Sequence, residues 1–240
     1  MNFRQLRNIS LLFTFCISNL VFVDTDLAQS PGESGNRSQQ PDSRSKSKRL
    51  EIIENIPYAD TENPRQQLDL FLPHSRVNDA PLPIVAFIHG GGWRNGSRRS
   101  GLSFLGPLVR SGKYIGVSIG YRLTDEAIWP AQIHDCKAAI RWLRANAAKY
   151  TADPEKIVVA GSSAGGHLVA VLGTSGDVPD LEGELGIWGK KSSRVQGVVN
   201  FFGPSDFTSM GGWHNNPDSP ESLLLGGPVQ DNKKIARTAS

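Results

Sequence analysis

Gly161-Ser162-Ser163-Ala164-Gly165 is the stretch of this 240-residue chain that decides the fold. It fits the pattern G-x-S-x-G, with Ser163 in the serine position. A β-branched apolar run (157–160) precedes it, and a stretch of helical character (166–172) follows it. A strand that enters a helix through so tight a turn presents the serine hydroxyl at the carboxyl end of the strand. The pentapeptide alone fits an ordinary glycine- and serine-rich turn equally well, so the rest of the chain must decide between the two interpretations.

Strand and helix patterns alternate along the body of the chain. Apolar runs predict strands at 52–58, 67–72, 83–88, 114–123, 157–160 and 195–202, and helical spacing predicts helices at 104–109, 130–144 and 166–172. We expect a break at Asp153-Pro154, a loop at 173–191, and a turn-rich tail at 203–240 with one apolar run, 223–225. This alternation predicts an α/β fold: an antiparallel first pair, then a mostly parallel doubly wound sheet with helices on both faces.

The amino terminus predicts export. In residues 1–28, Arg4 and Arg7 precede an apolar stretch that ends near Ala28, which indicates a signal peptide or an uncleaved N-terminal anchor. Residues 29–49 are rich in Ser, Gly, Pro and basic side chains and predict a disordered linker. The folded domain is therefore expected at 50–240, in a periplasmic or secreted protein.

Composition and charge exclude several function classes. The chain is 38% hydrophobic and 20% charged, which is typical of a soluble globular protein, and its net charge is +3. This net positive charge comes entirely from residues 29–49, which contain five basic and two acidic residues. The sequence therefore does not predict a basic surface on the folded domain that would bind nucleic acid. Cys16 lies in the export segment, so Cys136 has no partner for an internal disulfide and is expected to be buried in a helix.

Acyl transfer by a serine needs a nucleophile, a base, a group that orients the base, and donors for the oxyanion. Ser163 is the candidate nucleophile. His89-Gly90-Gly91-Gly92 follows a predicted buried strand, and its glycines allow backbone N–H groups to turn inward. The amides of Gly91, Gly92 and Ala164 are the candidate oxyanion hole. No H-E-x-x-H motif or cysteine pair predicts a metal site, and no motif predicts a cofactor.

Several ordered motifs carry a resemblance to the α/β-hydrolase superfamily. They are His89-Gly90-Gly91-Gly92-Trp93, Gly120-Tyr121-Arg122-Leu123, Trp129-Pro130-Ala131-Gln132-Ile133-His134-Asp135, Ala139-Ile140-Arg141-Trp142-Leu143, Gly161–His167 and Gly203-Pro204-Ser205-Asp206. The chain resembles the HGGG esterases related to hormone-sensitive lipase, and most of all exported bacterial esterases of the feruloyl- and acetyl-esterase type. The resemblance implies a carboxylic ester hydrolase that forms an acyl-enzyme from a small-molecule ester or an acylated saccharide. It also implies a structural role for His89, which would hold the glycine loop.

The family pattern also places an acid and then a histidine on later segments than this chain contains. By that pattern the chain looks truncated by about 60–90 residues, or degenerate. The alternative function is therefore a non-catalytic protein of the same fold. Without the last strands of the family sheet, the strand at 195–202 would have an exposed parallel edge, so we expect poor solubility.

Other side chains could substitute for the missing acid and base. Asp206, after the strand at 195–202, is a candidate acid, and a Ser163–Asp206–His214 triad stays open. Three further predictions concern structure: His167 packs inside the helix after Ser163, His134 orients its helix, and His74 is exposed. Asp135 is expected to pair with Arg122, while Trp93 and Trp129 fit either a substrate pocket or the core.

Overall fold

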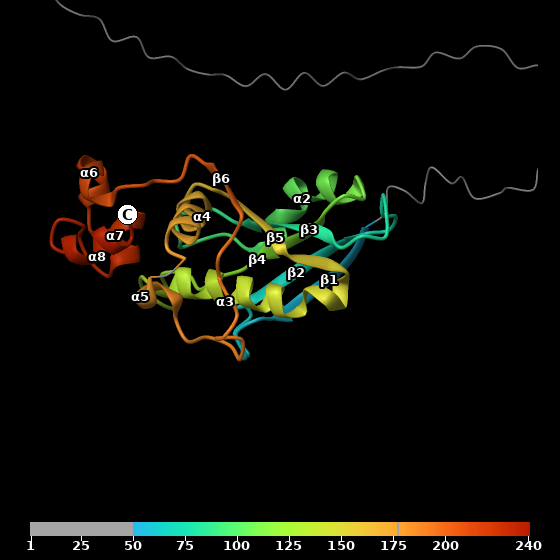
Figure 1. Cartoon of the computed structure of the whole chain (residues 1–240). Coiled ribbons are helices and arrows are strands. Elements are labelled where there is room, and N and C mark those ends of the chain that lie inside the picture. The colour runs from blue at the N-terminus through green and yellow to red at the C-terminus, as the bar shows by residue number, and fades with distance from the viewer. Residues whose placement is uncertain (1–49, 177) are drawn as a thin grey trace, which may run out of the picture. The chain divides into compact units, whose positions relative to one another are not determined.

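The computed structural model of the protein describes residues 50–176 and 178–240 (Figure 1). The predicted export segment, 1–28, and the predicted linker, 29–49, lie outside the described residues. The described part of the chain forms a six-stranded sheet with helices on both faces, which confirms the predicted α/β fold. Within that part, none of the helices has the length and apolar character needed to cross a membrane.

The sheet has the strand order β1-β2-β4-β3-β5-β6. Its strands are β1 (Leu50–Pro57), β2 (Gln67–Pro73), β3 (Leu82–Ile88), β4 (Ile115–Ile119), β5 (Ala152–Ser162) and β6 (Gly197–Phe201). β2 is antiparallel to β1 and β4, and the remaining neighbours are parallel, as the sequence predicts. β5 begins before Asp153-Pro154 instead of after it. The β3–β5 register is irregular between the pairs Leu82–Ala152 and Ile84–Ile157, so the proline falls where the ladder needs no N–H donor.

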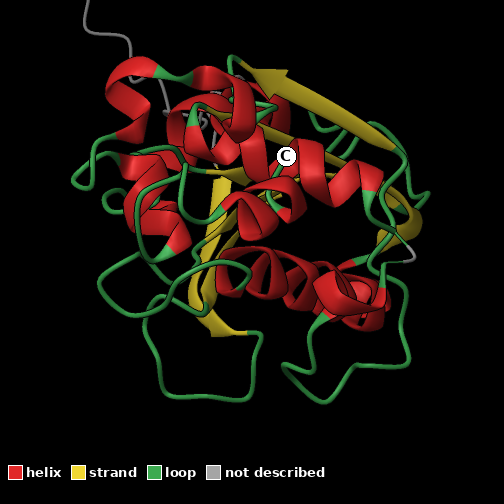
Figure 2. Ribbon diagram, turned by 90° about the vertical axis from the view of Figure 1, so that its left-hand side faces the viewer, coloured by secondary structure: helices red, strands yellow, loops and turns green. Residues whose placement is uncertain are grey.

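Helices cover the two faces of the sheet unequally. The elements are η1 (Arg98–Ser100), α2 (Gly101–Arg110), α3 (Ala131–Asn146), η2 (Ala147–Tyr150), α4 (Ala164–Thr174), α5 (Pro179–Glu182), α6 (Phe207–Met210), η3 (Gly212–Asn215), α7 (Pro220–Leu225) and α8 (Lys233–Thr238). α2 lies on one side of the strands and α3 on the other (Figure 1), and Figure 2 shows the helices on both sides of the sheet. α4 packs against both α3 and β5.

Side-chain alternation along β3 divides the core in two. Ile84, Ala86 and Ile88 belong to the large hydrophobic cluster that also contains apolar side chains of α3 and α4. Phe87, which points to the opposite face, joins a small cluster with Leu105 and Val109 of α2. A period of two is what a strand covered on both faces requires. The run at 83–88 therefore holds both layers together.

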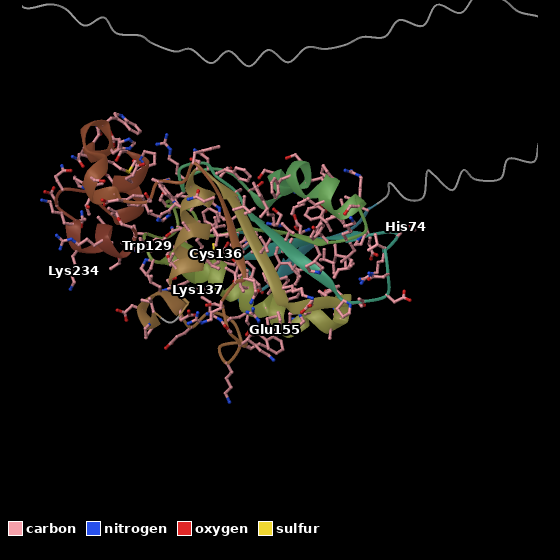
Figure 3. The ribbon with its side chains drawn as sticks, turned by 45° about the horizontal axis from the view of Figure 1, so that its top comes forward. His74, Trp129, Cys136, Lys137, Glu155 and Lys234 are labelled. Carbon is pink, nitrogen blue, oxygen red and sulfur yellow. The ribbon has the colours of Figure 1, made fainter. Side chains whose placement is uncertain are left out.

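The loop expected at 173–191 contains one short helix, α5, that the sequence does not indicate. Glu182, the last residue of α5, accepts a hydrogen bond from Lys137 Nζ at 2.6 Å and one from Arg141 Nη1 at 3.1 Å. Both cations project from α3 and are almost fully buried, so they require a carboxylate partner. Cys136, beside them on α3 (Figure 3), is a buried free thiol whose pKa is raised by burial, as expected of a packed residue.

The tail at 203–240 is more helical than its sequence predicts. The expectation of turns is wrong for α6, α7 and α8, which gather beside α4 (Figure 1). Phe207, Leu224 and Ala236 are buried in the large cluster. These apolar residues are too far apart in the chain to show a helical period, and only packing against the rest of the domain brings them together. Trp129 secures the tail: its backbone N–H donates to Leu224 O and its Nε1 to Thr238 Oγ1.

The predicted pair of Asp135 and Arg122 is confirmed. The carboxylate of Asp135 is fully buried and accepts hydrogen bonds from Nη2 of Arg122 at 2.8 Å, from the Arg122 backbone N–H at 2.8 Å, and from Gln66 Nε2 at 2.8 Å. The pair ties the loop after β4 to the first turns of α3. Removal of the Asp135 carboxylate would leave the partly buried guanidinium of Arg122 and the buried amide of Gln66 without this acceptor.

We predict that Asp135→Ala lowers the free energy of unfolding by about 3–5 kcal/mol, because it breaks a buried ion pair from one side. Thermal or urea unfolding measures the loss. The matched control is Asp125→Ala, which removes the exposed carboxylate that pairs with Arg65 at 2.6 Å. Solvent screens that pair, so its loss should hardly move the unfolding midpoint. Similar midpoints for the two variants would contradict the structural role of Asp135.

β6 is one edge of the sheet, as the sequence predicts for the strand at 195–202. It pairs with β5 on one side and with no other strand in the described part of the chain. Val198, Val199 and Phe201 remain about 40% exposed along this edge. Unpaired backbone and exposed apolar side chains together favour pairing with another chain.

We therefore predict that the protein self-associates through β6. Size-exclusion chromatography with light scattering should show species larger than a monomer. Val199→Lys, which places a charge on the edge, should shift the population toward the monomer. A matched Val77→Lys exchange, at an exposed position in the loop between β2 and β3, should not. A clean monomer peak for the unmodified protein would contradict the prediction.

Candidate active site

Ser163 is the single residue between the end of β5 and the start of α4. Its backbone has φ 53° and ψ −120°, a conformation that an L-residue rarely adopts and that costs about 1–3 kcal/mol. The Ser163 N–H donates to Phe201 O of β6 at 2.9 Å, which helps to hold the turn. Its side chain is exposed, and no residue in the described segments forms a hydrogen bond with its Oγ. The turn therefore presents a free hydroxyl.

The glycines of the pentapeptide permit a close approach of backbone segments. A Cβ atom at Gly165 would overlap the carbonyl oxygen of Ile88 and would lie 2.6 Å from that of His89. A Cβ atom at Gly161 would overlap the carbonyl group of Gly165 itself. The spacing in G-x-S-x-G thus reflects contact between the β5–α4 turn and the end of β3. That contact brings the serine turn and the glycine loop together.

The glycine loop lies directly beside the serine. A Cβ atom at Gly90 would lie 3.4 Å from Cβ of Ser163. Gly91 has φ 112° and Gly92 has φ 60°, both in the region that glycine adopts without strain. No backbone hydrogen bond in the described part of the chain is donated by the N–H of Gly91 or Gly92. Ala164 is the first residue of α4, so its N–H has no intrahelical partner. These three amides remain the predicted oxyanion hole.

His89 supports the loop. Its ring stacks on that of Tyr121 at a centroid distance of 4.4 Å, and its Nδ1 lies 2.8 Å from Gly90 O, an acceptor, so Nδ1 carries the proton. The Tyr121 hydroxyl donates to His89 O at 3.0 Å. Burial lowers the pKa of His89 to about 4, so the ring is neutral at physiological pH. This environment fits the structural role that the family resemblance implies.

One pocket contains Ser163. It has a volume of about 430 Å³, and its walls include Gly92, Trp93, Met210, His214 and Glu221. Trp93 and Trp129 are both buried, and the core interpretation holds for Trp129. Trp93 belongs to the core and also lines the Ser163 pocket. The described residues contain no group of three or more His, Cys, Asp and Glu side chains arranged to hold a metal ion.

Three histidines lie away from the Ser163 hydroxyl. His167 is buried among the rings of Trp93, Trp129 and Phe207, and its Nε2 lies 2.6 Å from Ala239 O. It packs as predicted. His134 Nε2 lies 3.0 Å from Asp180 O, which ties α3 to α5. His74 is exposed, at the opposite end of the domain from Trp129 (Figure 3).

The structure does not assemble the Ser163–Asp206–His214 arrangement. Asp206 caps α6: its Oδ1 accepts from Thr208 N at 2.9 Å and from Thr208 Oγ1 at 2.5 Å. Hydrogen bonds from Thr208 and Ser209 hold the pKa of Asp206 below its usual value. Asp206 is not part of the wall of the Ser163 pocket, whereas His214 is. The role of Asp206 as an acid stays a prediction.

Glu221 is the pocket residue that the sequence does not reveal. Its Oε2 lies 3.1 Å from Nδ1 of His214. In the sequence it is only an acidic residue that follows Pro220 in the first turn of α7, a common position for a carboxylate. Six residues lie between His214 on η3 and Glu221 on α7, and the fold of the tail brings the two side chains together.

We predict that burial of His167 makes stability depend on pH. Burial lowers the pKa of His167 to about 4, below the unfolded value of about 6.5. The unfolded chain therefore binds more protons between these values, and stability falls as pH falls through that window. This group alone should cost about 2 kcal/mol between pH 7 and pH 5. His167→Gln keeps a donor for Ala239 O without titrating, so its unfolding midpoint should change less over that range. Equal changes in both proteins would contradict the prediction.

The BD-FAE family model matches residues 68–240. Among curated proteins, esterase LipC of Mycobacterium tuberculosis is 37% identical over 147 residues, which is 61% of this chain and 36% of that protein. Carboxylesterase NlhH of the same species is 45% identical over 95 residues, which is 38% of this chain and 28% of that protein. The chain thus spans about a third of the length of the curated relatives it matches.

Two solved structures resemble the domain closely. A bifunctional GH43-CE protein of Bacteroides eggerthii is 36% identical with a TM-score of 0.74, and the match covers 79% of this chain and 28% of that one. A truncated form of a carbohydrate esterase from gut microbiota is 33% identical with a TM-score of 0.72, and the match covers 79% of this chain and 70% of that one. The strained serine turn, the glycine loop and a family match over well more than half of the chain agree: this protein belongs to the BD-FAE family and has the α/β-hydrolase fold.

Proposed function

We propose that this protein is a serine hydrolase of the carboxylesterase and lipase type, which cleaves carboxylic esters through an acyl-enzyme. One observation carries the proposal: a strained, exposed Ser163 shares a pocket with Gly92, and among the described residues the N–H groups of Gly91 and Gly92 donate to no backbone acceptor. The names of the related esterases support it. We assign the nucleophile to Ser163 and the oxyanion hole to Gly91, Gly92 and Ala164.

The proposed chemistry follows from this geometry. Ser163 Oγ forms a bond to the carbonyl carbon of the ester while its proton passes to solvent water, and the carbonyl π electrons move to the carbonyl oxygen, which becomes negatively charged. The three amides donate to that oxygen, and each such donor stabilises the transition state by about 3 kcal/mol. The amino terminus of α4 adds a positive end of a helix dipole at the same place. Collapse of the intermediate breaks the ester C–O bond, and the departing alkoxide takes a proton from water and leaves as the alcohol. A second water molecule then attacks the acyl-enzyme, which releases the acid and returns a proton to Ser163 Oγ.

The substrate class is a small-molecule ester or an acylated saccharide. The pocket of about 430 Å³ has room for a short acyl group and part of an alcohol. The structural similarity to a carbohydrate esterase supports the saccharide ester. The basic and apolar pattern of residues 1–28 supports export, so we place the reaction in the periplasm or outside the cell.

The second candidate function is a non-catalytic protein of the same fold. It is favoured by the absence, within the described residues, of any side chain that hydrogen-bonds to Ser163 Oγ. Without a base, an oxyanion hole and substrate binding give only about 10³–10⁴-fold acceleration over water. Such a protein would bind esters and turn them over poorly.

We predict that p-nitrophenyl acetate hydrolysis by this protein depends on Ser163. Ser163→Ala should lower kcat/KM by at least about 10³-fold, because it removes the nucleophile. Ser162→Ala, a matched change at the preceding position of the same turn, should leave most of the activity. Equal rates for the unmodified protein and Ser163→Ala would show that the chain acts as the non-catalytic alternative.

A further inference from the structure

His214 and Glu221 form a polar pair in the wall of the Ser163 pocket that the proposed chemistry does not use. His214 lies on η3 and Glu221 on α7. The backbone between them is tightly organised: Ser219 Oγ donates to His214 O at 2.7 Å, and the same Oγ accepts from Ser222 N at 3.1 Å to cap α7. The pair is therefore held in place before any ligand arrives.

The carboxylate of Glu221 has unused capacity to accept hydrogen bonds. The residue is only 5% exposed, yet no hydrogen bond to its carboxylate occurs among the described residues. Its Oε2 lies 3.1 Å from Nδ1 of His214, but the two groups are not aligned as donor and acceptor. An ionised carboxylate offers about four acceptor positions, and burying it unsatisfied is costly. A buried acceptor at the wall of a ligand pocket is suited to a ligand donor.

Resting on the proposed function, we propose that His214 and Glu221 bind a hydroxyl group on the alcohol part of the substrate. The hydroxyl would donate to the Glu221 carboxylate, and a neighbouring hydroxyl of the same alcohol would exchange a hydrogen bond with Nε2 of His214. A hydroxyl is both donor and acceptor, so it matches a carboxylate beside an imidazole. The ester group meanwhile lies at Ser163, in the same pocket.

Two features favour a hydroxyl-bearing alcohol over a cationic one. Nδ1 of His214 lies 3.1 Å from the carboxylate, so a ligand group here meets a ring nitrogen as well as an acceptor, and a hydroxyl, which can both donate and accept, suits the two better than an ammonium group, which can only donate. Trp213 is 61% exposed and contacts the His214 ring edge-on at 5.6 Å. Its ring offers an apolar surface with a polar edge, which suits a ligand whose carbon skeleton carries hydroxyl groups.

The pair is assigned to recognition rather than to proton transfer. Among the described residues no hydrogen bond joins His214 to Ser163, and the Nδ1 of His214 lies beside Glu221 instead. Both residues line the same cavity as the nucleophile. They are therefore placed to contact the leaving alcohol.

Binding measured without turnover tests this proposal. In the Ser163→Ala protein, ligand-observed NMR titrations would compare glycerol 1-acetate with propyl acetate, which has the same carbon chains without the two hydroxyl groups. We expect glycerol 1-acetate to bind at least about fivefold tighter, the size of one or two net hydrogen bonds. Adding Glu221→Ala should remove this preference and leave the affinity for propyl acetate unchanged. The matched control is Glu155→Ala, which removes an exposed carboxylate on β5 and should keep the preference.

Each outcome of these titrations either supports or overturns the proposed subsite. Equal affinities for the two esters, or a preference that survives Glu221→Ala, overturns the subsite. Should circular dichroism show that Glu221→Ala does not fold, Glu221→Gln decides in its place. That variant keeps the shape and loses the charge, so it should reduce the preference at least twofold, and an unchanged preference overturns the proposal. Because the Ser163→Ala background needs no catalysis, failure of ester hydrolysis in the unmodified protein is a separate result and does not affect this test.

Discussion

The close approach of the β5–α4 turn to the end of β3 is the constraint on which the rest of the site depends. Gly165 lies so near the carbonyl oxygens of Ile88 and His89 that no larger residue fits. This contact determines where Ser163 stands relative to the glycine loop, and it is the reason that both parts end at the same edge of the sheet. The positive φ of Ser163 is the energetic cost, and the parallel β3–β5 ladder and the bond to Phe201 O offset it.

Buried polar groups hold the loops around that contact. Asp135 ties the loop after β4 to α3, and Tyr121, stacked on His89, supports the glycine loop from below. His167 does the same for the carboxyl-terminal tail through Ala239 O. Each forms at least one hydrogen bond with its loop and so rigidifies it, and removing one partner leaves another buried group without a hydrogen bond. The loops of the site are thus held by buried polar contacts as well as by the apolar core.

The short helices of the tail complete the pocket. Without α6, η3 and α7, the Ser163 turn would face solvent with only the glycine loop beside it. Met210, His214 and Glu221 supply one wall, and Pro220 would lie 3.2 Å from a Cβ atom at Gly92, so α7 also contacts the glycine loop. The tail therefore joins the nucleophile, the oxyanion donors and a polar pair in one cavity. The proposed acyl chemistry and the proposed recognition of the alcohol would take place in this one cavity.

The sequence by itself determined the fold class, the serine turn and the glycine loop, because each depends on residues adjacent in the chain. A β-branched run, two spaced glycines and a following helix are local signals that predict the serine turn. Gly91 and Gly92 predict a loop in the same way. Asp135 with Arg122 was also predicted, since both belong to an ordered set of motifs. The pairing of His214 with Glu221, the capping role of Asp206 and the helices of the tail were decided by tertiary structure alone. These features depend on how the tail packs against α4 and on which buried groups need a hydrogen-bond partner. Neither condition produces a periodic pattern in the sequence.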